Sequence, residues 1–142
     1  MKLKAKDLQE FGDAVRDLVW RDDVIELLPE GDYGAGGCWA LARAIQEFLG
    51  PPAELWAIAS NYNLVEHVVV RYGDVYLDYD GASTERKLIA RFLDEYTYPA
   101  WAAVRKLDPA RARFARKVGI PCDPWVVKKL VSLMNRNFVE RD

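Results

Sequence analysis

The sequence contains few of the residues on which metal sites and disulfide frameworks depend. It has one histidine and two cysteines in 142 residues, and the cysteines, Cys38 and Cys122, lie far apart in the chain. Zinc sites and disulfide scaffolds need more such residues at closer spacing. We therefore expect no metal site and a reducing environment in which both thiols stay free.

Long apolar runs and an excess of one charge are missing as well. No stretch could span a bilayer, and residues 1–7 lack the apolar run of a signal peptide. The 20 basic and 22 acidic side chains leave a net charge of −2, whereas nucleic-acid-binding proteins usually have a strongly basic surface. We therefore predict a cytoplasmic protein that binds neither membranes nor nucleic acids.

Apolar residues are plentiful, at 51% of the chain, and their spacing predicts two helices in the first third. The first covers residues 7–28, with Asp7 as its N-cap and an interruption at the charged residues 21–23. The second covers residues 38–49 and is apolar on most sides, which is typical of a central helix. Gly50 is well placed to end it.

The pattern then changes to that of β-strands. Three stretches rich in β-branched, aromatic and other apolar residues, 54–60, 66–72 and 75–79, are predicted strands. Gly73-Asp74 separates the last two and is typical of a tight hairpin turn. These strands are therefore expected to form an antiparallel sheet.

Residues 82–142 contain three signals for helix starts, at Thr84, Asp108-Pro109 and Asp123-Pro124. The middle helix is expected to end at Gly119. Helices, then strands, then helices predict a single α+β domain over residues 1–142. In it a central cysteine-bearing helix packs on a small antiparallel sheet, and residues 82–142 form a helical extension on that core.

The start of the central helix is the first candidate for chemistry. Gly34-Ala35-Gly36-Gly37 leads directly into Cys38, which lies in the first helical turn. Unpaired backbone N–H groups and the positive end of the helix dipole favour a thiolate at that position. Cys38 is therefore a candidate nucleophile, whereas Cys122 has no second histidine to serve it.

The hairpin supplies a base and an acid. With a two-residue turn at Gly73-Asp74, His67 lies opposite Asp80, and both share a sheet face with Asp78. An imidazole oriented by a carboxylate can accept a thiol proton. This register brings both aspartates within reach of His67 and does not choose between them.

These residues resemble papain-like and transglutaminase-like cysteine enzymes over about residues 31–81. Gly36-Gly37-Cys38-Trp39 is similar to the start of the nucleophile helix of that superfamily. The strands that carry the His and the Asp in that superfamily are similar to Glu66–Val70 and Tyr76–Gly81. The resemblance implies Cys38 as nucleophile, His67 as base and Asp78 as orienter, because Asp78 precedes Gly81 by three residues. Asp80 is the alternate.

Papain-like peptidases usually place a glutamine a few residues before the cysteine to help hold an oxyanion. The corresponding loop here contains Asp32 and Tyr33 and no glutamine or asparagine. An oxyanion would then depend on the backbone N–H of Cys38, with Gly37, Tyr33 and Trp39 on the oxyanion and substrate side.

Two functions follow as hypotheses. The first is a cysteine hydrolase or acyltransferase that cleaves an amide, ester or isopeptide bond of a peptide or protein, without a metal or organic cofactor. The second is a catalytically inactive binding module on the same fold, as in mobile-element, toxin-related or virion-associated proteins. Loss of activity on replacing Cys38 would separate them.

Overall fold

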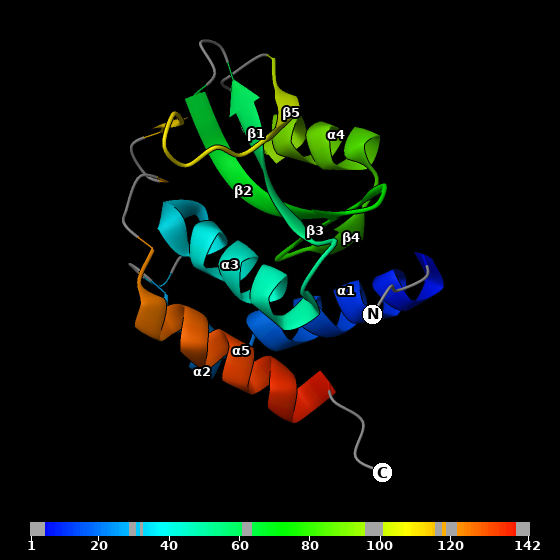
Figure 1. Ribbon diagram of the computed structural model, residues 1–142, viewed down its shortest axis with the longest axis vertical. Helices are drawn as coiled ribbons and strands as arrows, with labels where there is room; N and C mark the ends of the chain where they lie inside the picture. The colour runs from blue at the N-terminus through cyan, green and yellow to red at the C-terminus, as the bar shows by residue number, and fades with distance from the viewer. Residues whose placement is uncertain are drawn as a thin grey trace.

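The helix that begins at Cys38 lies between the sheet and another helix, α5, in the computed structural model (Figure 1). The structure describes residues 5–28, 31, 33–60, 64–95, 101–115, 118 and 122–138. Its α-helices are α1 (Ala5–Val19), α2 (Asp22–Ile25), α3 (Cys38–Leu49), α4 (Glu85–Glu95) and α5 (Pro124–Phe138). Its strands are β1 (Glu54–Ser60), β2 (Leu64–Tyr72), β3 (Val75–Asp78), β4 (Gly81–Ser83), β5 (Ala103–Lys106) and β6 (Arg113–Phe114).

The strands form one sheet in the order β4-β3-β2-β1-β5, and β6 pairs with the start of β2. All pairs are antiparallel except β2 with β6. The cysteine-bearing helix α3 packs on β1, β2 and β3, with helices before and after this unit in the chain. The predicted α+β fold is therefore confirmed, with a larger sheet than expected.

The two faces of the sheet are covered by different helices. Val68 and Val70 of β2 belong to the core on the α3 side, whereas Val69 between them packs with Leu88 and Phe92 of α4. This alternation is the period of two expected of a strand that is buried on both faces. The sheet thus separates the cysteine-bearing helix from α4 (Figure 1).

Several of the predicted helix signals are confirmed. Lys87 donates its backbone N–H to Thr84 Oγ1 at 3.3 Å, and α4 begins at the intervening Glu85. At the start of α5, the backbone N–H of Trp125 donates a hydrogen bond to Asp123 Oδ1 at 2.8 Å. Gly50 follows α3 with φ of 68°. Because side-chain oxygens satisfy N–H groups that a helix start leaves free, these caps fix where the helices begin.

Other predicted boundaries were wrong. The first helix begins at Ala5, so Asp7 lies in its first turn rather than at the N-cap. Asp108 accepts a hydrogen bond from Ala110 N at 3.1 Å, but a turn and β6 follow instead of a helix. An aspartate before proline opens turns and helices alike. The expected end of that helix, Gly119, lies outside the described residues. Residues 82–142 also contain β5, β6 and the last two residues of β4, so the prediction of a purely helical extension was wrong.

Helix α1 lies close against β4 at two glycines. A Cβ on Gly12 would lie 2.5 Å from Ala82 N, and one on Gly81 would lie 3.0 Å from Gly12 O. Gly81 also has φ of 93°, a conformation that favours glycine. The turn that follows Asp78 is therefore held against the N-terminal helix by backbone contact.

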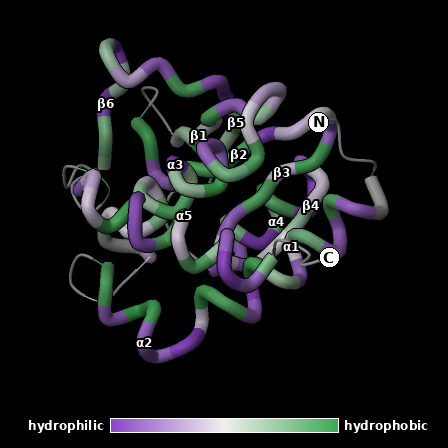
Figure 2. Tube along the Cα trace, turned by 60° about the horizontal axis from the view of Figure 1, so that its bottom comes forward, coloured by the Kyte–Doolittle hydropathy of each residue, from purple (hydrophilic) through white to green (hydrophobic). Residues whose placement is uncertain are grey.

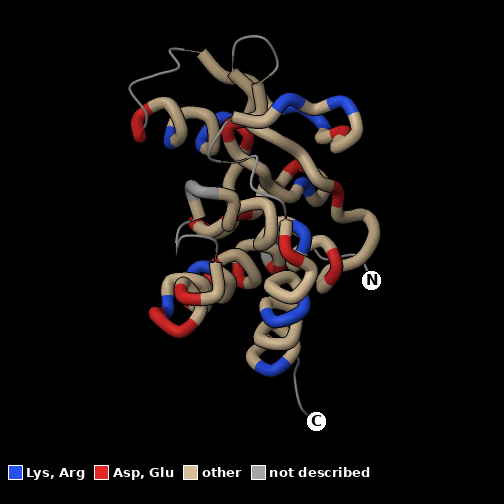
Figure 3. The backbone as a smooth tube through the Cα atoms, turned by 90° about the vertical axis from the view of Figure 1, so that its left-hand side faces the viewer, with Lys and Arg blue, Asp and Glu red and all other residues tan. Residues whose placement is uncertain are grey.

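Polar residues lie mainly on the outer faces of the helices. In α2, two aspartates are followed by the apolar residues Val24 and Ile25, and Val24 is buried (Figure 2). Basic and acidic residues are interspersed over helices and strands (Figure 3). In the part of the chain that the structure describes, no helix has the length and apolar character needed to cross a membrane.

Candidate active site

Cys38 is the first residue of α3 and follows a π-helical turn over Tyr33–Gly37. The glycines permit this turn, since Gly36 has φ of 94°. The side chain of Cys38 is 2% exposed, and both cysteines are free thiols. The first turn of a helix is the predicted place for a stabilised thiolate.

His67 lies on β2 next to an irregularity in the sheet. Ile58 of β1 pairs with His67 and the next residue, Ala59, pairs with Val65, so Glu66 is an extra residue in β2. A bulge of this kind changes the direction of neighbouring side chains. The imidazole is 5% exposed and lies 5.1 Å from the Tyr79 ring, measured between ring centroids.

Asp78, the last residue of β3, binds the imidazole. The hairpin turn has the predicted register, with Tyr72 opposite Val75, and the paired ladder ends at Val70 and Leu77. Beyond it, Asp78 Oδ2 lies 2.9 Å from His67 Nε2. A carboxylate only accepts hydrogen bonds, so Nε2 carries the proton and Nδ1 is left for another partner.

Asp80, the alternate acid, has a different position. Its backbone N–H donates to Asp78 Oδ1 at 2.9 Å, and its carboxylate pairs with Arg91 Nε at 3.2 Å. Burial raises the pKa of Asp80, and the charge of Arg91 opposes this rise. Asp80 therefore supports Asp78, while Asp78 contacts the histidine.

The Cys38 thiol is the further partner of His67. Burial alone would lower the pKa of His67, but hydrogen bonds with Asp78 and Cys38, together with their negative charges, raise it to about 10. Burial likewise opposes ionisation of Asp78, but its hydrogen bond with His67 and the charges of His67 and Arg91 hold its pKa below the usual value. The imidazole therefore keeps its proton well above neutral pH, because its interactions with Asp78 and Cys38 outweigh the effect of burial.

Sequence reasoning missed one residue of this cluster, Arg91 of α4. Its Nη2 donates to Asp78 Oδ2, and its Nη1 lies 3.4 Å from Ser83 Oγ. Arg91 follows Thr84, the N-terminal signal of α4, by seven residues, but the sequence carries no sign that α4 packs beside β3. Only the three-dimensional arrangement places this arginine next to the acid.

The residues assigned to the oxyanion and substrate side lie as follows. Tyr33 is buried, and its hydroxyl donates to Val19 O at 2.6 Å. Trp39 stacks on Phe114 of β6 with ring centroids 4.6 Å apart. Gly37 is buried immediately before Cys38, and Asp32 lies outside the described residues. The hydroxyl of Tyr33 therefore has a backbone partner of its own.

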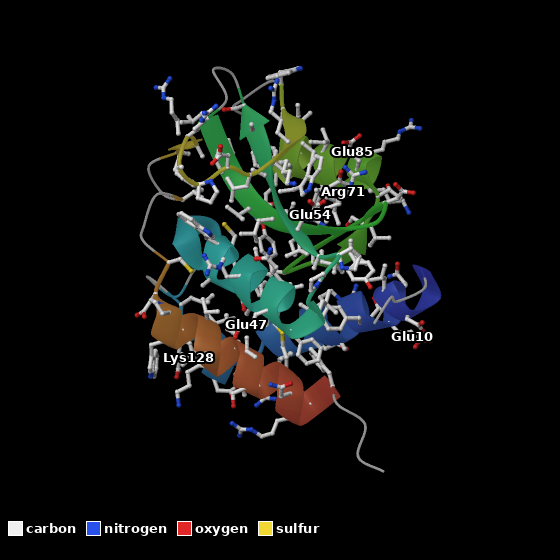
Figure 4. The ribbon with its side chains drawn as sticks, viewed as in Figure 1. Glu10, Glu47, Glu54, Arg71, Glu85 and Lys128 are labelled. Atoms are coloured by element: carbon white, nitrogen blue, oxygen red, sulfur yellow. The ribbon has the colours of Figure 1, made fainter. Side chains whose placement is uncertain are left out.

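Cys122 lies apart from this cluster, beside a pocket of about 210 Å³ that Glu47 and Lys128 also line. These two residues come from the neighbouring helices α3 and α5 (Figure 4). Burial raises the pKa of the Cys122 thiol. No histidine serves it, because the chain's one histidine binds Asp78.

No group of three or more His, Cys, Asp or Glu side chains in the described residues is arranged to hold a metal ion. Comparison with protein-family models, with curated proteins and with solved structures finds no match for this chain. Any function must therefore be argued from the geometry of the site.

Proposed function

We propose that this protein is a cysteine hydrolase or acyltransferase that acts on an amide, ester or isopeptide bond. The observation that carries this proposal is that the chain's one histidine interacts with both Cys38 and Asp78. Cys38 is the nucleophile, His67 the general base and Asp78 the residue that orients the imidazole. The resemblance of these residues to papain-like enzymes supports the same roles.

The reaction needs two half-reactions. The Cys38 thiolate adds to the substrate carbonyl, the sulfur–carbon bond forms, and His67 gives its proton to the departing amine or alcohol as the scissile bond breaks. Water, or a second amine, then gives a proton to His67 and attacks the thioester. The acyl group leaves on that nucleophile, and the thiolate and the protonated His67 are restored. Atoms and charges balance without a metal or organic cofactor.

The substrate class that suits this chemistry is a peptide or protein. A cavity of about 190 Å³ lies beside β1 and β5, and its lining includes Val65, Leu107 and Arg105 but not Cys38, His67 or Asp78. Because Cys38 must remain a free thiol, the reaction suits a reducing compartment such as the cytoplasm.

A p-nitrophenyl ester tests the proposal as an acyl donor. The full chain should release nitrophenol and retain the acyl group on Cys38, as located by mass spectrometry of peptides. Cys38→Ala should abolish the adduct, Cys122→Ala should retain it, and His67→Gln should slow acylation at least about 100-fold. Acylation of Cys122 instead, or an unchanged rate in Cys38→Ala, would overturn the proposal.

The burial of the cluster favours a second candidate, a binding module in which the same residues are structural. Cys38, His67 and Asp78 are each no more than 5% exposed. This burial limits the access of a substrate carbonyl to the Cys38 sulfur. Absence of any acyl adduct on the folded wild-type protein would favour this second function over the first.

A further inference from the structure

The Asp78 carboxylate has more partners than a residue that only orients a histidine requires. Oδ1 accepts from the backbone N–H of Asp80, and Oδ2 accepts from both His67 Nε2 and Arg91 Nη2. Its side chain is 2% exposed. A buried carboxylate with three hydrogen-bond partners, of which Arg91 and the protonated His67 are cations, remains ionised because each bond favours the anion.

Arg91 reaches this carboxylate from α4, whereas Cys38 belongs to α3. The apolar residues of α4 pack on the opposite face of the sheet from α3. The guanidinium of Arg91 also reaches Asp80, in the turn after β3, and Ser83, at the end of β4. A planar fork with several donors can hold two acceptors in fixed positions at once.

We propose that Arg91 is a positioning residue, which holds the Asp78 carboxylate ionised and directed at His67. The inference rests on the proposed function, in which Asp78 orients the base. Arg91 does not touch the reacting atoms, and it acts only through Asp78. Asp80 in turn holds Arg91 and leaves the contact with the imidazole to Asp78.

Four other charged or titratable groups act on Asp78 directly or through its neighbours. His67 of β2 bonds to it, and Cys38 of α3 acts through His67. Asp80, in the turn after β3, shares Arg91 with it, and Arg16 of α1 acts on Asp80. Of the cations, Arg91 is the one that bonds to the Asp78 carboxylate besides His67 itself. After His67, Arg91 is therefore the group whose removal should change the ionisation of Asp78 most.

Nuclear magnetic resonance of the imidazole tests this without turnover, since the chain contains a single histidine. Protonation of Asp78 at acid pH produces an inflection in the His67 signal. Arg91→Gln should move that inflection upward by about one pH unit or more. Arg91→Lys keeps the charge and should move it less. Arg86→Gln, the same change at an exposed position of α4, should leave it unmoved.

An unmoved inflection in folded Arg91→Gln would overturn the proposal and leave Arg91 a purely structural residue. If Arg91→Gln does not fold, Arg91→Lys compared with Arg86→Lys decides, and equal inflections would overturn it. If the inflection shifts in Arg91→Gln but Cys38 of the wild-type protein accepts no acyl group, the proposed enzymatic function is wrong and the positioning role of Arg91 stands. If Cys38 is acylated but the inflection does not move, the enzymatic function stands and the positioning role of Arg91 is wrong.

Discussion

Burial and hydrogen bonding have opposite effects on the pKa of His67. Burial disfavours the charged imidazole, but Asp78 and Cys38 stabilise it and raise its pKa from 6.5 to about 10. The native state therefore holds this proton more tightly than the unfolded chain does. The extra stability is fully present below about pH 6.5 and is lost as pH rises through about 10.

We expect the free energy of unfolding to fall between pH 6.5 and about 10 because of this single group. Urea denaturation at a series of pH values measures it. His67→Gln removes the titrating imidazole and should give a flatter profile in that range. Equal slopes for the wild-type protein and the variant would show that His67 is not the cause.

The predicted hairpin register alone did not choose between Asp78 and Asp80, although the resemblance to papain-like enzymes favoured Asp78. The turn at Gly73-Asp74 fixed the register, but His67 lies beyond the last residue pair of the β2–β3 ladder, where strict alternation no longer applies. The hydrogen bond to Asp78 depends on where the ladder ends and on the bulge at Glu66. Neither the end of the ladder nor the bulge can be predicted from the spacing of apolar residues.

At the scale of elements, the central helix and the hairpin were predictable because their residue patterns are long and regular. β1 has the predicted bounds, 54–60, and α3 begins at Cys38. β5 and β6 were not predicted, since they contain four and two residues and include Arg105, Lys106 and Arg113. Such charged, short segments do not differ in pattern from the exposed face of a helix.

The contact of α1 with β4 gives a prediction at this scale. In Gly12→Ala the new Cβ would meet the backbone of Ala82 at 2.5 Å, so helix and strand must separate. We expect a loss of about 1–3 kcal/mol in the free energy of unfolding, measured by thermal or chemical denaturation. Glu10→Ala, on an exposed position of the same helix (Figure 4), is the control and should change stability little. A Gly12→Ala variant as stable as the wild type would show that the two elements do not pack this closely.

For the whole molecule, the topology explains why residues far apart in the sequence form one site. α3 supplies Cys38 on one side of the sheet, the β2–β3 hairpin supplies His67 and Asp78, and α4 supplies Arg91. The order of a helix and a hairpin predicted Cys38 and His67 and left Asp78 and Asp80 as alternatives, of which the resemblance to papain-like enzymes favoured Asp78. The sequence could not predict Arg91, because nothing in α4 shows against which strand the helix packs.

The pKa of the chain's one histidine tests the central claim most directly, since nuclear magnetic resonance needs no access to the buried site. We expect His67 to titrate at about 10 in the wild-type protein, because its interactions with Asp78 and Cys38 both raise its pKa. Cys38→Ala removes one of these two interactions and should lower the pKa of His67. A pKa of His67 that is the same in the wild-type protein and in Cys38→Ala would contradict the interaction between Cys38 and His67.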